Sequence, residues 1–112
     1  VQVSIPIGSE DQARDFYCGA LGMIEVPKPE SLAERGGFWV EVDNFQIHFG
    51  TEDGIDRLKS KAHVATVDDL EHWRGQLSEA GVTMIDGIPI PGYDRFEFRD
   101  PFGNRVEFLQ KI

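Results

Sequence analysis

Cysteine is almost absent from the 112-residue sequence: Cys18 stands alone, so no disulfide can form within the chain. Disulfides belong to oxidising compartments, and without a cysteine framework we expect a cytoplasmic protein. No apolar run approaches the length of a membrane span, and no signal peptide is recognisable. These absences predict a protein without a membrane partner.

Basic residues are also scarce, with 11 Lys and Arg against 20 Asp and Glu and a net charge of −9. A protein that binds nucleic acid needs a basic face to neutralise phosphate, so we expect no nucleic-acid partner. Hydrophobic residues at 40% and aromatic residues at 11% are too frequent for a disordered chain. The length suits a single domain that covers residues 1–112.

The first half of the chain predicts one helix among several strands. Apolar and polar residues alternate from Val1 to Pro6, which is typical of a strand. Ser9 begins a capping-box pattern for a helix, and Gly22 stands where such a helix ends. We also expect a helical turn within 30–35 and strands over 23–26, 38–42 and 45–48.

The second half repeats this order of elements. Asp68 is the expected cap of a second helix, and Gly81 follows its apolar stripe at a spacing of 59 residues from Gly22. We expect strands over 63–67, 82–85, 95–99 and 104–109. The economical interpretation is two tandem βαβββ modules, at about 1–50 and 61–112, joined by a polar linker at 51–60.

The strands predict one polar sheet face that no helix covers. Each helix must bury its apolar stripe on a sheet, and strand side chains alternate between the two faces. If the apolar residues of each strand face the helices, Val64 faces a helix. The open face then carries Gln2, His48, His63, Arg95, Glu97, Arg99, Arg105 and Glu107. Such a face is either solvated or a ligand site.

Three runs of residues resemble the vicinal oxygen chelate superfamily, the group of glyoxalases, bleomycin resistance proteins and extradiol dioxygenases. They are the segments 63–70, the helix carrying Phe16 and Tyr17, and above all the Asp-Pro-Phe-Gly-Asn-Arg-Val-Glu run at 100–107. The resemblance covers nearly the whole chain. It implies an α+β fold in which two βαβββ modules form a curved, cup-shaped mixed sheet with helices on its outer face.

The resemblance also implies a divalent metal in the cup, bound by His48, His63 and Glu107, with Glu107 as the catalytic base. Zn, Ni, Fe(II), Mn and Co all suit such imidazole and carboxylate ligands. Two departures stand out. The family's first-strand ligand position falls immediately before Val1, although Gln2 shares its face. The stretch from His63 to Asp69 is one residue shorter than usual, so either a bulge absorbs the difference or the register shifts.

Other roles stay open for the same residues. Glu107 could form a salt bridge to a nearby arginine, His63 could be an ordinary strand histidine, and His48 could contact substrate. The arginines could neutralise Glu97 or hold an anionic group of a ligand. The predicted substrate-binding residues are Gln2, Trp39, Arg95, Arg99 and Arg105, with further contacts in the loops 27–37 and 86–94.

The resemblance leaves three functions open. The first is a metal-dependent lyase, isomerase or dioxygenase whose small substrate chelates the metal through adjacent oxygens. The second is an antibiotic-resistance enzyme that adds a thiol or water with the same metal. The third is a metal-free protein that sequesters a drug in the cup. Because unpaired sheet edges need cover, we expect a homodimer.

Overall fold

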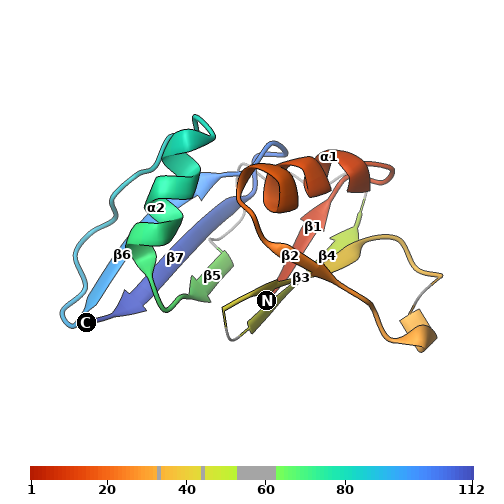
Figure 1. The fold of residues 1–112 in the computed structure, drawn as a ribbon, viewed down its shortest axis with the longest axis horizontal. Coiled ribbons are helices and arrows are strands. Elements are labelled where there is room, and N and C mark those ends of the chain that lie inside the picture. Colours follow the sequence, from red (N-terminus) through yellow and green to blue (C-terminus); the bar gives the residue numbers. More distant parts are fainter. Residues whose placement is uncertain (33, 44, 53–62) are drawn as a thin grey trace.

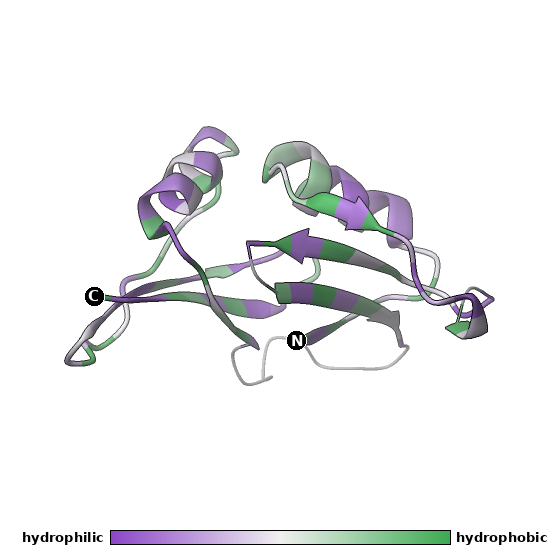
Figure 2. Cartoon of the chain, turned by 60° about the horizontal axis from the view of Figure 1, so that its bottom comes forward, coloured by the Kyte–Doolittle hydropathy of each residue, from purple (hydrophilic) through white to green (hydrophobic). Residues whose placement is uncertain are grey.

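The computed structural model describes residues 1–32, 34–43, 45–52 and 63–112. Strands in these ranges form two small sheets, and the helices lie on one side of them, as Figure 1 and Figure 2 show. The α+β class and the mixed strand orientation expected from the sequence are confirmed. No helix in the described ranges is long and apolar enough to cross a bilayer.

The N-terminal half forms a four-stranded sheet in the order β1-β4-β3-β2. Parallel pairing joins β1 to β4, and the other pairs are antiparallel. The elements are β1 (Gln2–Ile5), α1 (Glu10–Arg14), the π-helical continuation η1 (Asp15–Ala20), β2 (Ile24–Val26), the 3₁₀ turn η2 (Glu30–Leu32), β3 (Phe38–Val42) and β4 (Phe45–Thr51).

The C-terminal half forms a three-stranded sheet in the order β5-β7-β6, with β5 parallel to β7. Its elements are β5 (His63–Thr66), α2 (Leu70–Glu79), β6 (Tyr93–Arg99) and β7 (Arg105–Lys111). The strand expected over 82–85 is reduced to one bridge, in which Ile85 and Glu97 exchange backbone hydrogen bonds of 2.8 Å. The loop after Ile85 contains Pro89 and Pro91, which have no backbone N–H to donate in a strand pairing, so the strand does not continue there. Most of the expected linker, 53–60, lies outside the described residues.

Both helix starts differ in detail from the capping prediction. Ser9 precedes α1, but its hydroxyl donates to the carbonyl of Pro6 at 2.5 Å instead of capping a helical N–H. In α2 the cap is Asp69 and not Asp68, because Asp69 Oδ1 accepts from the backbone N–H of His72 at 3.3 Å. Asp68 instead donates its backbone N–H to Asp43 Oδ2 at 2.8 Å. The sequence placed each start correctly to within a residue or two.

The hydrophobic core lies between the helices and the two sheets. Its largest fully buried side chains come from both halves of the chain: Tyr17, Phe38, Phe96, Phe98, Phe108, Ile5, Leu21, Ile47, Leu70 and Leu77. Burying one such aliphatic or phenyl side chain contributes about 1.5–3 kcal/mol relative to exposure. The apolar faces of the two sheets are therefore occupied by core side chains in the part of the chain that the structure describes.

A buried polar cluster joins the two halves beside this core. The hydroxyl of Tyr17, in η1, donates to Asp100 Oδ2 at 2.7 Å. The side-chain amide of Asn104 donates to the same oxygen at 2.9 Å and to the carbonyl of Ser4, in β1, at 2.7 Å. Burial and the neighbouring Asp100 charge raise the pKa of Tyr17, so the phenol stays protonated and keeps donating. The turn at 100–104 thus fastens the C-terminal sheet to the N-terminal half.

Candidate functional site

Three side chains stand in a row on the open face of the N-terminal sheet. His48 is paired in register with Gln2 on one side and with Trp39 on the other. The rings of Trp39 and His48 stack almost in parallel, with centroids 3.5 Å apart and planes 5° apart. His48 Nε2 lies 3.0 Å from Gln46 Oε1, and burial lowers the pKa of His48. The result is a parallel, stacked aromatic pair whose imidazole is shifted toward its neutral form.

A groove of about 310 Å³ runs beside this ring pair. Gln2, Trp39 and His48 line it from the sheet, and two cations, Lys28 and Arg35, line it from the segment between β2 and β3. We call it the Trp39 groove. Sequence reasoning placed substrate contacts in the loop 27–37 without naming these two residues. Their positive charge in an acidic chain was the signal that could have identified them.

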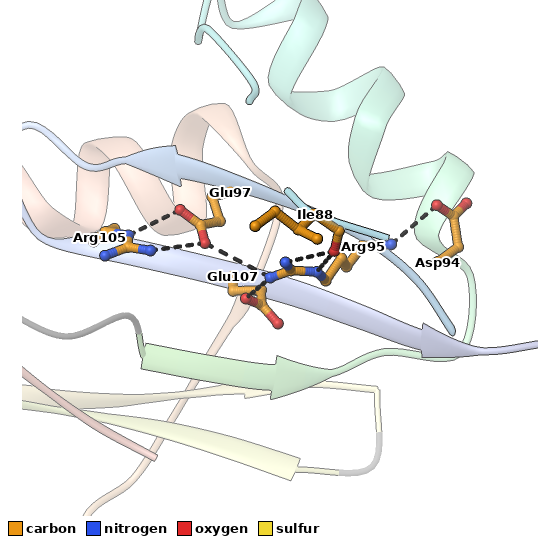
Figure 3. A network of polar contacts seen from close by, with 6 residues as sticks. All are labelled: Ile88, Asp94, Arg95, Glu97, Arg105 and Glu107. Atoms are coloured by element: carbon orange, nitrogen blue, oxygen red, sulfur yellow. Dashed lines mark hydrogen bonds and ion pairs between the residues drawn. The ribbon is translucent and has the colours of Figure 1, made fainter. Parts of the chain in front are cut away.

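The open face of the C-terminal sheet carries a network of alternating charges, drawn in Figure 3. Glu97 and Glu107 face each other in register on β6 and β7. Arg95 Nη1 contacts Glu107 Oε1 at 2.6 Å and lies 3.8 Å from Glu97 Oε1. Arg105 donates two hydrogen bonds of 2.8 and 3.0 Å to the carboxylate of Glu97, and these lower the pKa of Glu97. Two guanidinium groups thus neutralise the two carboxylates.

Arg95 also holds the loop between Ile85 and β6. Its Nε and Nη2 both donate to the carbonyl of Ile88, at 3.1 and 2.7 Å, as Figure 3 shows. Gly87 lies directly against the guanidinium, because a Cβ there would stand 2.5 Å from Arg95 Cζ. The side chain of Arg95, which projects from β6, therefore connects the loop at Ile88 to the carboxylate of Glu107 on β7. Arg99 is engaged elsewhere, donating to the carbonyl of Gly103 at 2.9 Å.

His63 does not lie on the open face, and its predicted placement there was wrong. The register pairs His63 with Val106 and Val64 with Glu107, and paired residues share a face. Val64 is accordingly 48% exposed, whereas His63 is half-buried on the side of the core. Burial lowers the pKa of His63, although the nearby Asp100 opposes this. The pairing of β5 with β7 runs without a bulge from His63 to Thr66.

The residues predicted to hold a metal do not fit one in this arrangement. His48 belongs to the N-terminal sheet, whereas Glu107 belongs to the C-terminal sheet and forms an ion pair with Arg95. His63 lies on the core-facing side of the C-terminal sheet, opposite the open face that carries Glu107. Within the described ranges, no three His, Cys, Asp or Glu side chains are grouped so that they could bind an ion. The salt bridge that the sequence offered as the other role of Glu107 is the contact the structure contains.

Comparison with known proteins gives one family and a set of structures. The family model described as Glyoxalase/Bleomycin resistance protein/Dioxygenase superfamily matches residues 1–108. A glyoxalase family protein from Bacillus anthracis is 39% identical, with a TM-score of 0.85 over 99% of this chain and 91% of that one. No curated protein sequence matches.

Two further structures share the fold at low identity. The antibiotic binding protein TnmS3 from Streptomyces sp. CB03234 is 21% identical, with a TM-score of 0.71 over 99% of this chain and 93% of that one. The fosfomycin resistance protein FosX from Listeria monocytogenes is 11% identical, with a TM-score of 0.66 over 100% of this chain and 88% of that one. At these identities the likeness concerns the fold alone.

Proposed function

Because the chain belongs to the glyoxalase/bleomycin resistance protein/dioxygenase superfamily, we propose that it binds a small organic molecule on its open sheet faces and does so without a metal. The observation that carries this proposal is the 2.6 Å contact between Arg95 and Glu107. The carboxylate that the family resemblance assigns to the metal already has a cationic partner here.

The energetics of this pair disfavour its replacement by a metal ion. The side chains of Arg95 and Glu107 are only 16% and 9% exposed, so both charges depend on each other for neutralisation. A divalent cation at Glu107 would stand beside a buried guanidinium and repel it. For the same reason Glu107 is not available to take a proton from a ligand, because its Oε1 already accepts a charge-assisted hydrogen bond.

A binding role agrees with what the fold supports in other proteins. TnmS3 is an antibiotic binding protein, and its structure superposes on nearly the whole of this chain. The Trp39 groove, at about 310 Å³, has the size of a small-molecule site. Its lining combines a stacked aromatic pair with several polar and charged side chains, so polar contacts would contribute much of the binding. We propose sequestration of a small molecule as the activity.

A metal-dependent lyase, isomerase or dioxygenase is the second candidate, together with a metal-dependent resistance enzyme. One observation favours it: His48 and Gln2 are register neighbours on the open face. A neutral imidazole is the commonest protein ligand of transition metals. This candidate requires ligands beyond those that the described residues group together.

Metal content decides between the two candidates. The protein would be stripped by a mild chelator and reloaded separately with Zn, Ni, Fe(II), Mn and Co before elemental analysis. We expect far less than one metal per chain, with Glu107→Ala and His48→Ala unchanged from wild type. Near-stoichiometric metal that both variants lose would replace the binding proposal with the enzyme.

We further propose that the protein works as a homodimer. The two polar faces belong to separate sheets, and the loop beside Arg95 exposes Ile85, Ile88 and Ile90 at 58%, 82% and 41%. Three exposed isoleucines within one short loop are the kind of surface that we expect a partner to cover. Sedimentation at micromolar concentration should report a dimer, which Ile88→Ser together with Ile90→Ser should weaken. A clean monomer of the wild type would contradict the proposal.

A further inference from the structure

We infer that the Trp39 groove selects a flat aromatic molecule carrying a negatively charged group. This inference rests on the proposed binding function and names the chemical class of its ligand. It depends on two features of the groove: the stacked rings on its sheet side and the two cations on its loop side.

The ring pair supplies an aromatic surface for an aromatic ligand. Trp39 and His48 are held parallel, 3.5 Å apart, by direct cross-strand register, so the wall is organised before a ligand arrives. Gln2 extends the same row from β1, and its Nε2 lies over Gly50, where a Cβ would approach it to 2.8 Å. One face of each ring is covered by the other, so an aromatic ligand would pack against the remaining face or the edge of the indole.

The cations supply the preference for negative charge. Lys28 and Arg35 line the groove from the β2–β3 segment, and the ammonium of Lys28 donates to the backbone carbonyl of Arg35. Among the described residues, the guanidinium of Arg35 forms no ion pair, so its donors remain available. The carboxylate that lines this groove, Glu52, accepts the hydroxyl of Ser4 at 3.0 Å. Among the described residues that line the groove, two cations stand against one carboxylate, which makes this lining locally positive.

A second hollow shares these cations. Lys28 and Arg35 also border a smaller hollow of about 240 Å³, whose other charged residues are Glu10, Arg14 and Glu25. Arg14 in that hollow is paired with Glu25 at 3.0 Å. The Trp39 groove differs from this hollow because it adds the stacked rings of Trp39 and His48 to the shared cations.

The test uses three probes in the presence of chelator: 2-naphthoate, its neutral amide, and cyclohexanecarboxylate. Calorimetry measures affinity, and tryptophan emission reports the site. The chain has two tryptophans, and Trp73 is 5% exposed in the core, so quenching reports Trp39. We expect 2-naphthoate to bind about tenfold tighter than either control probe, the difference that one charge-assisted contact or one lost ring contact produces.

Variants separate the contribution of the aromatic ring from that of the two cations. Trp39→Leu should remove the advantage of naphthoate over cyclohexanecarboxylate, and Lys28→Gln with Arg35→Gln should remove its advantage over the amide. Lys111→Gln, an exposed cation at the far end of β7, is the matched control and should change neither. Equal binding of naphthoate and its amide, or naphthoate binding that Trp39→Leu leaves intact, would overturn the inference.

A wider screen keeps this inference separate from the proposed function. A thermal-shift screen of neutral and cationic drug-sized molecules, also with chelator, runs in parallel. If those compounds bind while naphthoate does not, the ligand class is wrong and the binding function stands. If nothing binds until a metal is restored, the proposed function itself fails, and this inference fails with it.

Discussion

Arg95 and Glu107 are joined at 2.6 Å across neighbouring strands, although the residue that faces Glu107 in register is another glutamate, Glu97. Two carboxylates facing each other repel, and the pair is tolerated because a guanidinium reaches diagonally between them. Arg105 neutralises Glu97 from the other side. The face assigned to a metal by the family resemblance is thus internally neutralised by arginine.

Arg95→Ala should destabilise the protein more than any other single change on this face. It leaves Glu107 without its partner at 9% side-chain exposure, a situation that costs about 3–5 kcal/mol of unfolding free energy. Urea denaturation measures the loss. Arg105→Ala, whose side chain is 40% exposed, is the matched control and should lose less.

A double-mutant cycle separates the pair from general damage to the sheet. Adding Glu107→Gln to Arg95→Ala should restore part of the lost stability, because no unpaired charge is then buried. Additive losses in the double variant would show that Arg95 and Glu107 are not energetically coupled.

Gly87→Ala should loosen the loop that Arg95 holds. The added methyl would stand 2.5 Å from Arg95 Cζ, so the guanidinium must leave the Ile88 carbonyl or Glu107. Overpacking of this kind costs about 1–3 kcal/mol, and limited proteolysis should cut 86–92 faster. Gly75→Ala, in α2 with open space around its Cβ, is the control and should stabilise the helix by about 1 kcal/mol. Equal proteolysis of both variants would contradict the role of Arg95 in holding this loop.

Tyr17→Phe should weaken the junction between the two halves. The substitution removes the 2.7 Å hydrogen bond to the buried carboxylate of Asp100, and hydrogen bonds to charged groups contribute about 1.5–3 kcal/mol. Tyr93→Phe, at an exposed position, should leave the unfolding midpoint unchanged. A Tyr17→Phe midpoint equal to that of wild type would show that the remaining donors, from Phe102 and Asn104, suffice to hold Asp100.

Stability should fall as the pH drops below the ordinary pKa of histidine. Burial lowers the folded-state pKa of His63, so folding favours its neutral form, and the unfolded chain binds the proton more readily. This contribution is fully present above about pH 6.5 and is lost as the pH falls through the lower folded-state pKa. Unfolding free energies between pH 7.5 and 5 should show the decline.

Matched histidine variants identify the group responsible. His63→Asn should flatten the decline between pH 7.5 and 5, and His72→Asn, on the exposed side of α2, should not. An unchanged slope in His63→Asn would assign the acid sensitivity to other groups, with His48 the next to test because burial lowers its pKa as well.

Local patterns were enough to predict the elements and most of the open face. Alternation along β1, β4, β6 and β7 placed Gln2, His48, Arg95 and Glu107 on the face that the structure gives them. The same argument failed for β5, where both sides are partly apolar. There the apolar pattern does not distinguish Val64 from His63, and packing against β7 decided the register.

What the sequence determined by itself was the α+β class, the order of elements and the two-residue period that separates core from open face, because these depend on chain geometry and on neighbours along the chain. The tertiary structure alone decided which arginine reaches Glu107, that His63 turns to the core, and that Lys28 and Arg35 meet the Trp39 groove. Those relations join residues on different strands and loops. They depend on register and on the path of a loop, which are fixed by packing between elements distant in sequence.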